Sequence, residues 1–304
     1  MTEETIREAP PILADQAEYL IATAARAPSV HNTQPWRFRV GRSAIGLYCD
    51  PRRKLQTDPI GREMLISCGA ALFGLRLAVR SLGYLAVVEL LPDPARLRLL
   101  ARVSLGAAEP MTVMERDMLK AVPHRHTHRG AFDAGPLPAG LAAGLQHDAL
   151  AEGATLDLVR DGIANQRLAD IVVMAGRRLD LDLQARAEVR RWSREVASPA
   201  RDGVPAHAFP ATADQRSGRQ PGRLRQRDFD LGRGLGRLPA GGSVPAVTAV
   251  LLTPGDSRAD WLRAGQALYR LLLHAASRWV FASLYTQPLE SAPIRALIRD
   301  RLSL

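Results

Sequence analysis

A ten-residue run near the N-terminus gathers several hydrogen-bonding side chains in one short connection. Residues 27–36 read Ala-Pro-Ser-Val-His-Asn-Thr-Gln-Pro-Trp, so hydroxyl, imidazole and amide groups come from Ser29, His31, Asn32 and Gln34. The prolines at 28 and 35 fix φ and remove backbone donors, which stiffens the connection. A rigid polar loop of this kind can hold a planar ligand with many acceptors, although an ordinary polar connection has the same composition.

A second run, residues 123–132, is rich in arginine and histidine and reads Pro-His-Arg-His-Thr-His-Arg-Gly-Ala-Phe. Arg125, Thr127 and Arg129 alternate, so an extended chain projects them to one side. Two guanidinium groups and a hydroxyl suit a phosphate. The histidines at 124, 126 and 128 leave metal binding open as an alternative, although no Asp, Glu or Cys adjoins them. A solvated basic loop is the third interpretation.

The elements that position these runs follow from hydrophobic periodicity. Helical spacing of apolar residues predicts helices over 12–26, 58–83, 111–121, 139–150, 163–195 and 257–282. Alternation predicts a hairpin over 36–47, turning at 41–43, and further strands at 87–91, 97–105, 154–160 and 247–252. Asp58 and Pro59 are predicted to be the N-cap and the first residue of the helix over 58–83. The first polar run therefore connects a helix to a strand.

Two longer segments bear on the organisation of the chain. Residues 198–245 hold many prolines, glycines and arginines but few large apolar side chains, which predicts a mobile flap or linker without a core of its own. Residues 68–78 align with 264–274, so that Gly69 meets Gly265 and Leu72 meets Leu268. Small residues at these positions let two helices approach closely while leucines fill the seam. Two unrelated alanine- and leucine-rich helices could also match in this way.

Composition limits the classes of partner. The net charge of +10 suggests nucleic acid, but only two of the basic residues are lysines, and no aromatic side chains interleave with the arginines, so we expect no nucleic-acid partner. The chain has no run of eighteen apolar residues and a polar, acidic N-terminus, so we expect no transmembrane helix, no secretory signal and no membrane partner. Cys49 and Cys68 lack metal-type or CxxC spacing and are predicted to be reduced thiols of a cytoplasmic protein.

The runs resemble motifs of the nitroreductase family. Ser-Val-His-Asn-Thr-Gln-Pro-Trp is similar to its flavin-contacting loop, most of all in the Acg-type FMN-binding branch. Arg-His-Thr-His-Arg resembles the Arg-x-Ser-x-Arg element that binds the FMN phosphate and ribityl chain. Residues 281–290, Phe-Ala-Ser-Leu-Tyr-Thr-Gln-Pro-Leu-Glu, resemble the Ser-x-x-x-Gln-Pro-Leu-Glu segment near the flavin N5 edge. This likeness adds Ser283, Thr286 and Gln287 as candidate flavin contacts, and residues 58–72 extend it.

The resemblance implies an α+β, nitroreductase-like fold. Two fused nitroreductase-type halves, residues 1–122 and 123–304, would form a pseudo-dimer in one chain, with a lid-like insertion at about 198–245. It implies FMN as cofactor, and NAD(P)H and a small planar acceptor, such as a nitroaromatic or quinone, as substrates, with hydride passing via flavin N5. We expect a monomer by internal duplication, no metal site and no separate catalytic side chain. The alternative is a catalytically quiet FMN-binding protein whose lid covers the flavin.

The sequence departs from the family pattern in two places. Gly74 stands where the family usually has Asn in the helix over 58–83, and we expect this glycine to weaken the helix by about 1 kcal/mol. The sequence ends at Leu304, before the basic C-terminal segment of family chains, so we expect weaker phosphate binding unless other arginines substitute.

Overall fold

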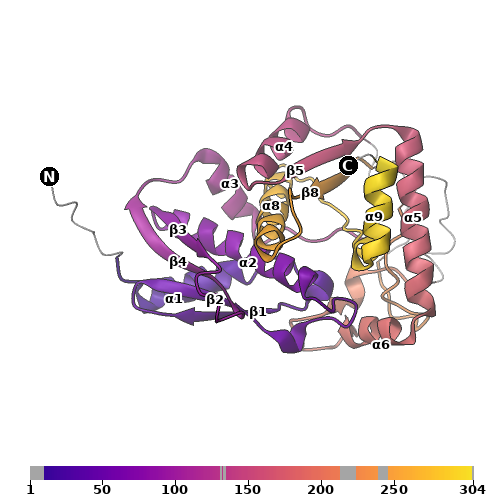
Figure 1. Cartoon of the computed structure of the whole chain (residues 1–304), viewed down its shortest axis with the longest axis horizontal. Helices are drawn as coiled ribbons and strands as arrows, with labels where there is room; N and C mark the ends of the chain where they lie inside the picture. Colours follow the sequence, from indigo (N-terminus) through magenta and orange to yellow (C-terminus); the bar gives the residue numbers. More distant parts are fainter. Residues whose placement is uncertain (1–9, 131, 133–134, 213–223, 239–245, 303–304) are drawn as a thin grey trace.

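The computed structural model describes residues 10–130, 132, 135–212, 224–238 and 246–302 (Figure 1). Its main sheet is antiparallel and has the strand order β1-β2-β4-β3. The strands are β1 (Trp36–Val40), β2 (Ala44–Cys49), β3 (Tyr84–Leu90) and β4 (Leu99–Ala108). The predicted hairpin is confirmed, because Trp36 lies opposite Cys49 and Val40 opposite Ile45. Ile45, Leu47 and Cys49 alternate along β2 and are all buried, as the period of a strand requires.

The largest apolar core lies between this sheet and a layer of helices. These helices are α1 (Ala14–Ala24), α2 (Arg62–Ser81), α3 (Val113–Ala121) and α8 (Arg258–Ser277). α2 and α8 pack against each other at the centre of the molecule (Figure 1). A Cβ on Gly265 would lie 1.9 Å from the carbonyl oxygen of Ile66, and one on Gly69 would lie 2.2 Å from that of Leu262. The predicted close approach of these two helices is therefore confirmed, and it requires glycine at both positions.

The remaining elements form two smaller groups. They are α4 (Leu141–Ala151), β5 (Thr155–Val159), α5 (Gly162–Leu181), α6 (Leu183–Trp192), β6 (Ser193–Arg194), β7 (Val204–Pro205), β8 (Thr248–Leu252), α9 (Ala292–Leu302) and the 3₁₀ turns Val30–Asn32, Pro51–Arg53, Ala206–Ala208 and Gln287–Glu290. α4 with β5 and β8 lies beside α8, and α5 with α6 and α9 lies farther from it (Figure 1). β5 pairs antiparallel with β8, and α9 lies along α5 (Figure 1). This mixed architecture, with antiparallel main sheets, is consistent with the expected α+β fold, while the internal duplication stays a prediction.

Three predicted helix boundaries were wrong. The stretch 163–195 is two helices, because the carboxylate of Asp182 accepts hydrogen bonds from the backbone of Gln184 (2.8 Å) and Ala185 (3.1 Å) and starts α6 anew. α2 begins at Arg62, and Asp58 instead accepts a bond from the Met64 N–H at 2.9 Å, inside the first turn. α8 ends at Ser277, before the predicted limit of 282.

The described parts of the segment 198–245 are more structured than predicted. Residues 198–212 and 224–238 bury Val204, Ala206, Phe209 and Phe229 against Val189 of α6. The expectation that this segment builds no core was therefore wrong. A buried aspartate also organises one of its loops, because Asp230 accepts four backbone hydrogen bonds, from residues 212, 234, 235 and 236. Residues 213–223 and 239–245 lie outside the described part of the chain.

The helix α2 bears on two further expectations. By length and composition alone it could cross a membrane, which the search for a run of eighteen apolar residues did not detect. However, 78% of its apolar window is buried inside the protein, as in the core helix of a soluble protein. Gly74 has a packing role, since a Cβ there would lie 3.1 Å from Cα of Ala24 and 3.2 Å from the ring of Tyr269. Cys49 and Cys68 are free thiols and are buried, as predicted.

Candidate cofactor-binding site

The first polar run forms a tight loop between α1 and β1. Its backbone takes positive φ at His31 (51°), Asn32 (55°) and Gln34 (50°), a conformation that L-residues adopt rarely. The hydroxyl of Ser29 accepts a hydrogen bond from the Gln34 N–H at 2.9 Å, which closes the loop on itself. The loop is also tied to α2, because the Val30 N–H donates to the hydroxyl of Ser67. Cross-bonding of this kind can hold an unfavourable backbone shape in place.

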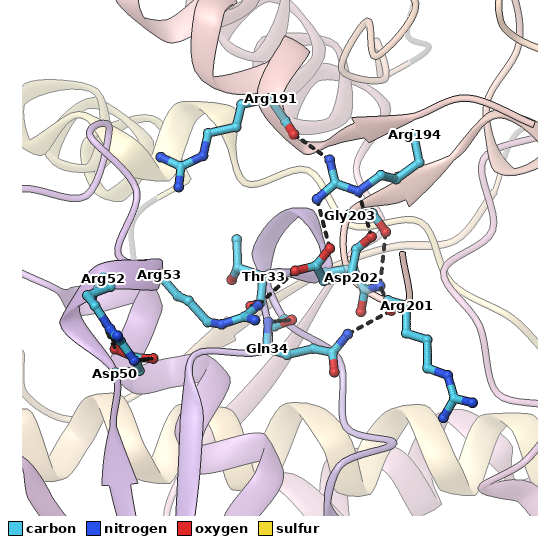
Figure 2. Close-up of polar contacts among 12 residues, drawn as sticks. Thr33, Gln34, Asp50, Arg52, Arg53, Arg191, Arg194, Arg201, Asp202 and Gly203 are labelled. Carbon is cyan, nitrogen blue, oxygen red and sulfur yellow. Dashed lines mark hydrogen bonds and ion pairs between the residues drawn. The ribbon is translucent and has the colours of Figure 1, made fainter. Parts of the chain in front are cut away.

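The amide side chains of this loop bind the backbone of residues 201–203. Asn32 Nδ2 donates to the carbonyl oxygens of Arg201 (3.2 Å) and Gly203 (2.9 Å). Gln34 Nε2 donates to the carbonyl oxygen of Arg201 at 2.8 Å (Figure 2). The Gly203 N–H returns a bond to the Asn32 carbonyl. Gly203 has φ of 78°, and a Cβ there would lie 2.7 Å from the Trp192 carbonyl oxygen, so glycine is needed for this close contact. Residues 201–203 therefore act as a strap across the loop.

Asp202 fastens this strap with two ion pairs. Figure 2 shows its carboxylate between Arg53 and Arg194, at 3.0 and 2.7 Å. Burial raises the pKa of Asp202, but hydrogen bonds from Arg194 and Arg53 outweigh it and leave the pKa below its usual value. Asp202 thus links the strap to two elements. Arg53 belongs to the 3₁₀ turn after β2, and Arg194 follows α6.

The second polar run brings two guanidinium groups into the protein. Burial lowers the pKa of Arg125 and lowers that of Arg129 to about 10, with the charge of Arg125 adding to the shift at Arg129. Nε and Nη1 of Arg125 are buried without a hydrogen-bond partner among the described residues. Among the described residues, the one hydrogen-bond contact of the Arg129 side chain is a long one, 3.5 Å to the Thr127 carbonyl oxygen. Neither arginine forms an ion pair with a described carboxylate, which is unusual for buried cations.

Phe229 joins the two runs. Its ring lies edge-on to the imidazole of His31, with centroids 5.4 Å apart, and Cζ of Arg129 lies 5.3 Å from its centroid. His31 is buried, and both of its ring nitrogens lack a partner among the described residues. Burial lowers the pKa of His31 well below its usual value, and the charges of Arg227 and Arg129 lower it further. His31 and Arg129, predicted from runs almost a hundred residues apart, therefore lie on the same phenyl ring.

In the third predicted segment, residues 281–290, one of the three candidate residues contacts the arginine run. The hydroxyl of Ser283 donates to the His128 carbonyl oxygen at 2.8 Å and accepts from Gln226 Nε2 at 2.7 Å. Gln287 is buried and contacts the carbonyl of Arg225 at 3.5 Å. Thr286 offers its carbonyl oxygen to the Leu289 N–H, as the residue before a 3₁₀ turn. Ser283 is therefore placed beside the arginine run, whereas Thr286 serves the 3₁₀ turn and Gln287 contacts the segment at Arg225.

The three histidines of the second run are placed by aromatic contacts. His124 stacks on Trp279, His126 on Phe281, and His128 lies tilted against Phe132, with centroids 4.9, 4.4 and 4.8 Å apart. Within the described residues no group of three His, Cys, Asp or Glu side chains is arranged to hold a metal ion. Thr127 pairs through its backbone with Ala282, which aligns the second and third runs.

Sequence reasoning placed Arg227, Asp228 and Phe229 in the lid-like insertion, but it did not foresee which of these residues contact the predicted site or that residues 201–203 bond the loop. Phe229 and Arg227 belong to a segment predicted to be a flap, and Gly203 lies in the same segment. Phe229 was the one detectable signal, because it is a large apolar residue in a stretch otherwise rich in arginine, aspartate and glycine. The strap itself left no signal, because Arg201 and Gly203 contribute backbone carbonyl oxygens that any residue would supply.

Comparison with known proteins places the chain in a family. No family model matches the chain. "Putative NAD(P)H nitroreductase Rv3131" of Mycobacterium tuberculosis H37Rv is 35% identical over 293 residues, which cover 94% of this chain and 80% of the relative. "Putative NAD(P)H nitroreductase acg" of the same strain is 30% identical over 311 residues, covering 96% and 90%. The uncharacterized protein Rv3127 of that strain is 30% identical over 288 residues. The chain therefore belongs to the nitroreductase family.

Proposed function

We propose that this protein is an FMN-dependent NAD(P)H oxidoreductase that reduces a nitroaromatic, a quinone or a similar planar acceptor. The names of its relatives support reductase activity with a nicotinamide substrate. The two half-buried arginines, Arg125 and Arg129, neither of which pairs with a described carboxylate, carry the assignment of the cofactor. Buried cations without a carboxylate partner are unfavourable unless an anion binds them, and a phosphate ester has the charge and the acceptor oxygens to do so.

The residues present fit a flavin mononucleotide at its phosphate end. The two partnerless nitrogens of Arg125 and the poorly bonded Arg129 are the donors that a phosphate requires. At the ring end, the amides of Asn32 and Gln34 now bind the strap, so we infer that they exchange the carbonyl oxygens of residues 201 and 203 for ring acceptors. His31 would then find a partner for a ring nitrogen that has none among the described residues.

Each group of residues would have a separate task. Arg125, Thr127 and Arg129 would anchor the phosphate and ribityl chain, and the loop at 29–34, together with Ser283, would orient the ring. When bound, FMN supplies the two-electron redox chemistry between NAD(P)H and the acceptor. Phe229, with the buried cluster around it, would exclude water from one side of the site. The chain itself would therefore orient the cofactor, provide positive charge at its phosphate and exclude water from one side of the site.

Titration with FMN tests the cofactor assignment. We expect FMN fluorescence to be quenched at a 1:1 ratio, and Arg129→Ala to weaken binding about 10- to 100-fold, because it removes a charged hydrogen-bond donor. Arg96→Ala is the matched control, since Arg96 is exposed and pairs only with Asp93 nearby. Equal FMN affinity in wild type and R129A would contradict the phosphate assignment. Absence of FMN binding by the wild type would overturn the proposed function.

Anaerobic reduction tests turnover. Mixing the FMN-loaded protein with NADH and, separately, NADPH should bleach the flavin absorbance, and adding a nitroaromatic or a quinone should restore it. A flavin that binds but never bleaches would show that the protein holds FMN without reductase activity.

A second candidate function is a catalytically quiet FMN-binding protein, which the strap favours. Both amides of the loop are bonded to residues 201–203, and Phe229 lies between His31 and Arg129. A strap and a ring in these positions could cover a bound flavin against substrates. The two candidates differ in whether loosening the strap raises or lowers turnover.

Asp202→Asn separates the two candidates. The change removes the ion pairs with Arg53 and Arg194 but keeps the size of the side chain. If the strap is inhibitory, we expect NAD(P)H oxidation to rise about threefold to tenfold, because the open state gains the free energy of two partly exposed ion pairs. If the strap orders the site, turnover falls. Asp93→Asn, which breaks an exposed pair with Arg96, should leave turnover unchanged.

A further inference from the structure

A cavity of about 190 Å³ lies beside the N-terminus of α2. Its walls come from the connection before α2, from the first turn of α2, from the 3₁₀ turn Gln287–Glu290 and from α9. Ile60 and Leu289 form an apolar part of the lining, and Ile60 is 64% exposed, so this part of the lining reaches the surface. None of the residues assigned above to the flavin lines this cavity.

Two buried acids in the lining lack a full set of partners. Glu63 is 5% exposed and the Glu290 side chain 4%, and both line the cavity. Oε2 of each is buried without a hydrogen-bond partner among the described residues, while Oε1 of Glu290 accepts from Arg227. A carboxylate oxygen that is buried without a donor is costly, so an ionised pair here requires a cation.

The described cations around the cavity leave two carboxylate oxygens without a partner. Asp58, Glu63, Asp256 and Glu290 face Arg62, Arg227 and Arg295, and Lys54 lies at the rim, where its Nζ donates to the Pro59 carbonyl oxygen at 2.7 Å. Farther out, Glu188 and Arg299 add one charge of each sign. Most of the cations are already engaged, since Arg62 pairs with Asp256, Arg227 with Glu290, and Arg295 donates to the Leu289 carbonyl. No described cation therefore bonds Oε2 of Glu63 or of Glu290, even where the net charge balances.

In the absence of a ligand, a proton on one of these two acids can remove the cost of an unpartnered carboxylate oxygen. Burial raises the pKa of Glu63 well above its usual value, and the charges of Glu290 and Asp58 raise it further against the opposing effect of Arg227 and Arg62. Burial also raises the pKa of Glu290, although Arg227 opposes the shift. An incoming cation would displace this proton, so its affinity should rise with pH.

We propose that this cavity binds the cationic end of an alkylammonium or alkylguanidinium group, with Glu63 and Glu290 as its acceptors. The apolar lining at Ile60 and Leu289 suits the methylene stem of such a group, and the volume suits a short stem. Both a free amine and a lysine or arginine side chain of a peptide have this chemistry. The site is independent of the flavin assignment.

Calorimetry with small probes tests the site on the full chain. At pH 8 we expect n-butylammonium or the peptide Gly-Arg-Gly to bind at a 1:1 ratio, and neutral n-butanol not to bind. Heats measured in buffers of different ionisation enthalpy should reveal a proton released on binding, and lowering the pH to 5.5 should weaken the affinity at least tenfold. Tighter binding of the amine would identify a free ligand, and tighter binding of the peptide a side chain.

Two variants complete the test. Glu63→Gln should weaken cation binding about 10- to 100-fold, because it removes a charged acceptor. It should also raise the thermal midpoint, because it removes an uncompensated buried acid. Glu18→Gln, on the exposed side of α1, should change neither. Failure of both cations to bind at pH 8, binding without proton release, or equal affinity in E63Q would each overturn the proposal, whatever the result of the FMN titration.

Discussion

His31 is a buried imidazole held next to two positive charges. Its ring is 6% exposed, and burial lowers its pKa well below 6.5, with the charges of Arg227 and Arg129 acting in the same direction. The folded protein therefore keeps His31 neutral at pH values where the unfolded chain binds a proton. Because the unfolded state binds more protons, stability is present above the unfolded pKa and is lost as the pH falls below it.

The lowered pKa of His31 predicts a measurable pH dependence of the free energy of unfolding. Between pH 7.5 and pH 5.5 the wild type should lose on the order of 1 kcal/mol of its free energy of unfolding through His31. The variant His31→Asn tolerates the positive φ at this position and should lack that loss. Urea unfolding of both proteins at both pH values gives the difference, in which the contributions of other groups cancel.

Another histidine provides a control for the pH dependence assigned to His31. His147→Gln alters an exposed histidine on α4 and should keep the wild-type pH dependence. If H31N loses as much stability as the wild type between the two pH values, then His31 either is protonated in the folded protein or is solvated, and the arrangement around Phe229 is wrong.

At the scale of elements, the contact between α2 and α8 depends on two glycines. Gly265→Ala would place Cβ 1.9 Å from the backbone oxygen of Ile66, and no side chain can rotate away to relieve that overlap. We expect a loss of about 3 kcal/mol of stability, since overpacking of a backbone contact forces the helices apart. Gly176→Ala in α5 is the matched control, because its Cβ would meet nothing within 4 Å.

The control variant Gly176→Ala should be more stable than the wild type. Alanine in a helix interior is favoured over glycine, so G176A should gain about 0.5 to 1 kcal/mol in the same urea experiment. A destabilisation of G265A no larger than a few tenths of a kcal/mol would show that α2 and α8 are farther apart than described, and would remove the physical basis of the glycine alignment.

The elements also show what local sequence could and could not predict. The hairpin over 36–47 and the Gly69–Gly265 contact were predictable because alternation and small residues are direct consequences of strand pairing and helix packing. The break at Asp182 was missed because the apolar periodicity continues through it, although an aspartate of this kind is a typical N-cap. The buried cluster of residues 204–209 and 229 was missed because its members are too far apart in sequence to form a period.

At the scale of the whole molecule, the site is made by distant segments that meet. The sequence identified the polar loop and the arginine run, and the structure brings His31 and Arg129 onto one ring. The segment with Phe229 was expected to be a lid, but its contacts with His31 and Arg129 could not be predicted, because its loop is folded around Asp230 and the strap offers only backbone carbonyl groups. The acids at 63 and 290 belong to motif runs that were interpreted separately, so their meeting in one cavity had no local signature.

The central helix pair leads to a prediction about assembly. Leu72 of α2 and Leu262 and Leu273 of α8 are fully buried in the core that these helices share within one chain. An apolar surface that is already covered gives a second copy little to bury, and covering such surface is the main driving force of stable association. We therefore expect a monomer, in agreement with the proposed internal duplication.

Sedimentation velocity measures this directly. The wild type should sediment as one species of about 33 kDa over a wide range of protein concentration, with or without FMN. A species of twice that mass, or a mass that rises with concentration, would contradict the prediction. Dimerisation would then have to use a face other than that between α2 and α8, because opening this contact would expose side chains such as Leu72 and Tyr269 that are now excluded from water. A monomer that binds one FMN would instead mean that a single chain supplies both the loop and the arginine run to one cofactor.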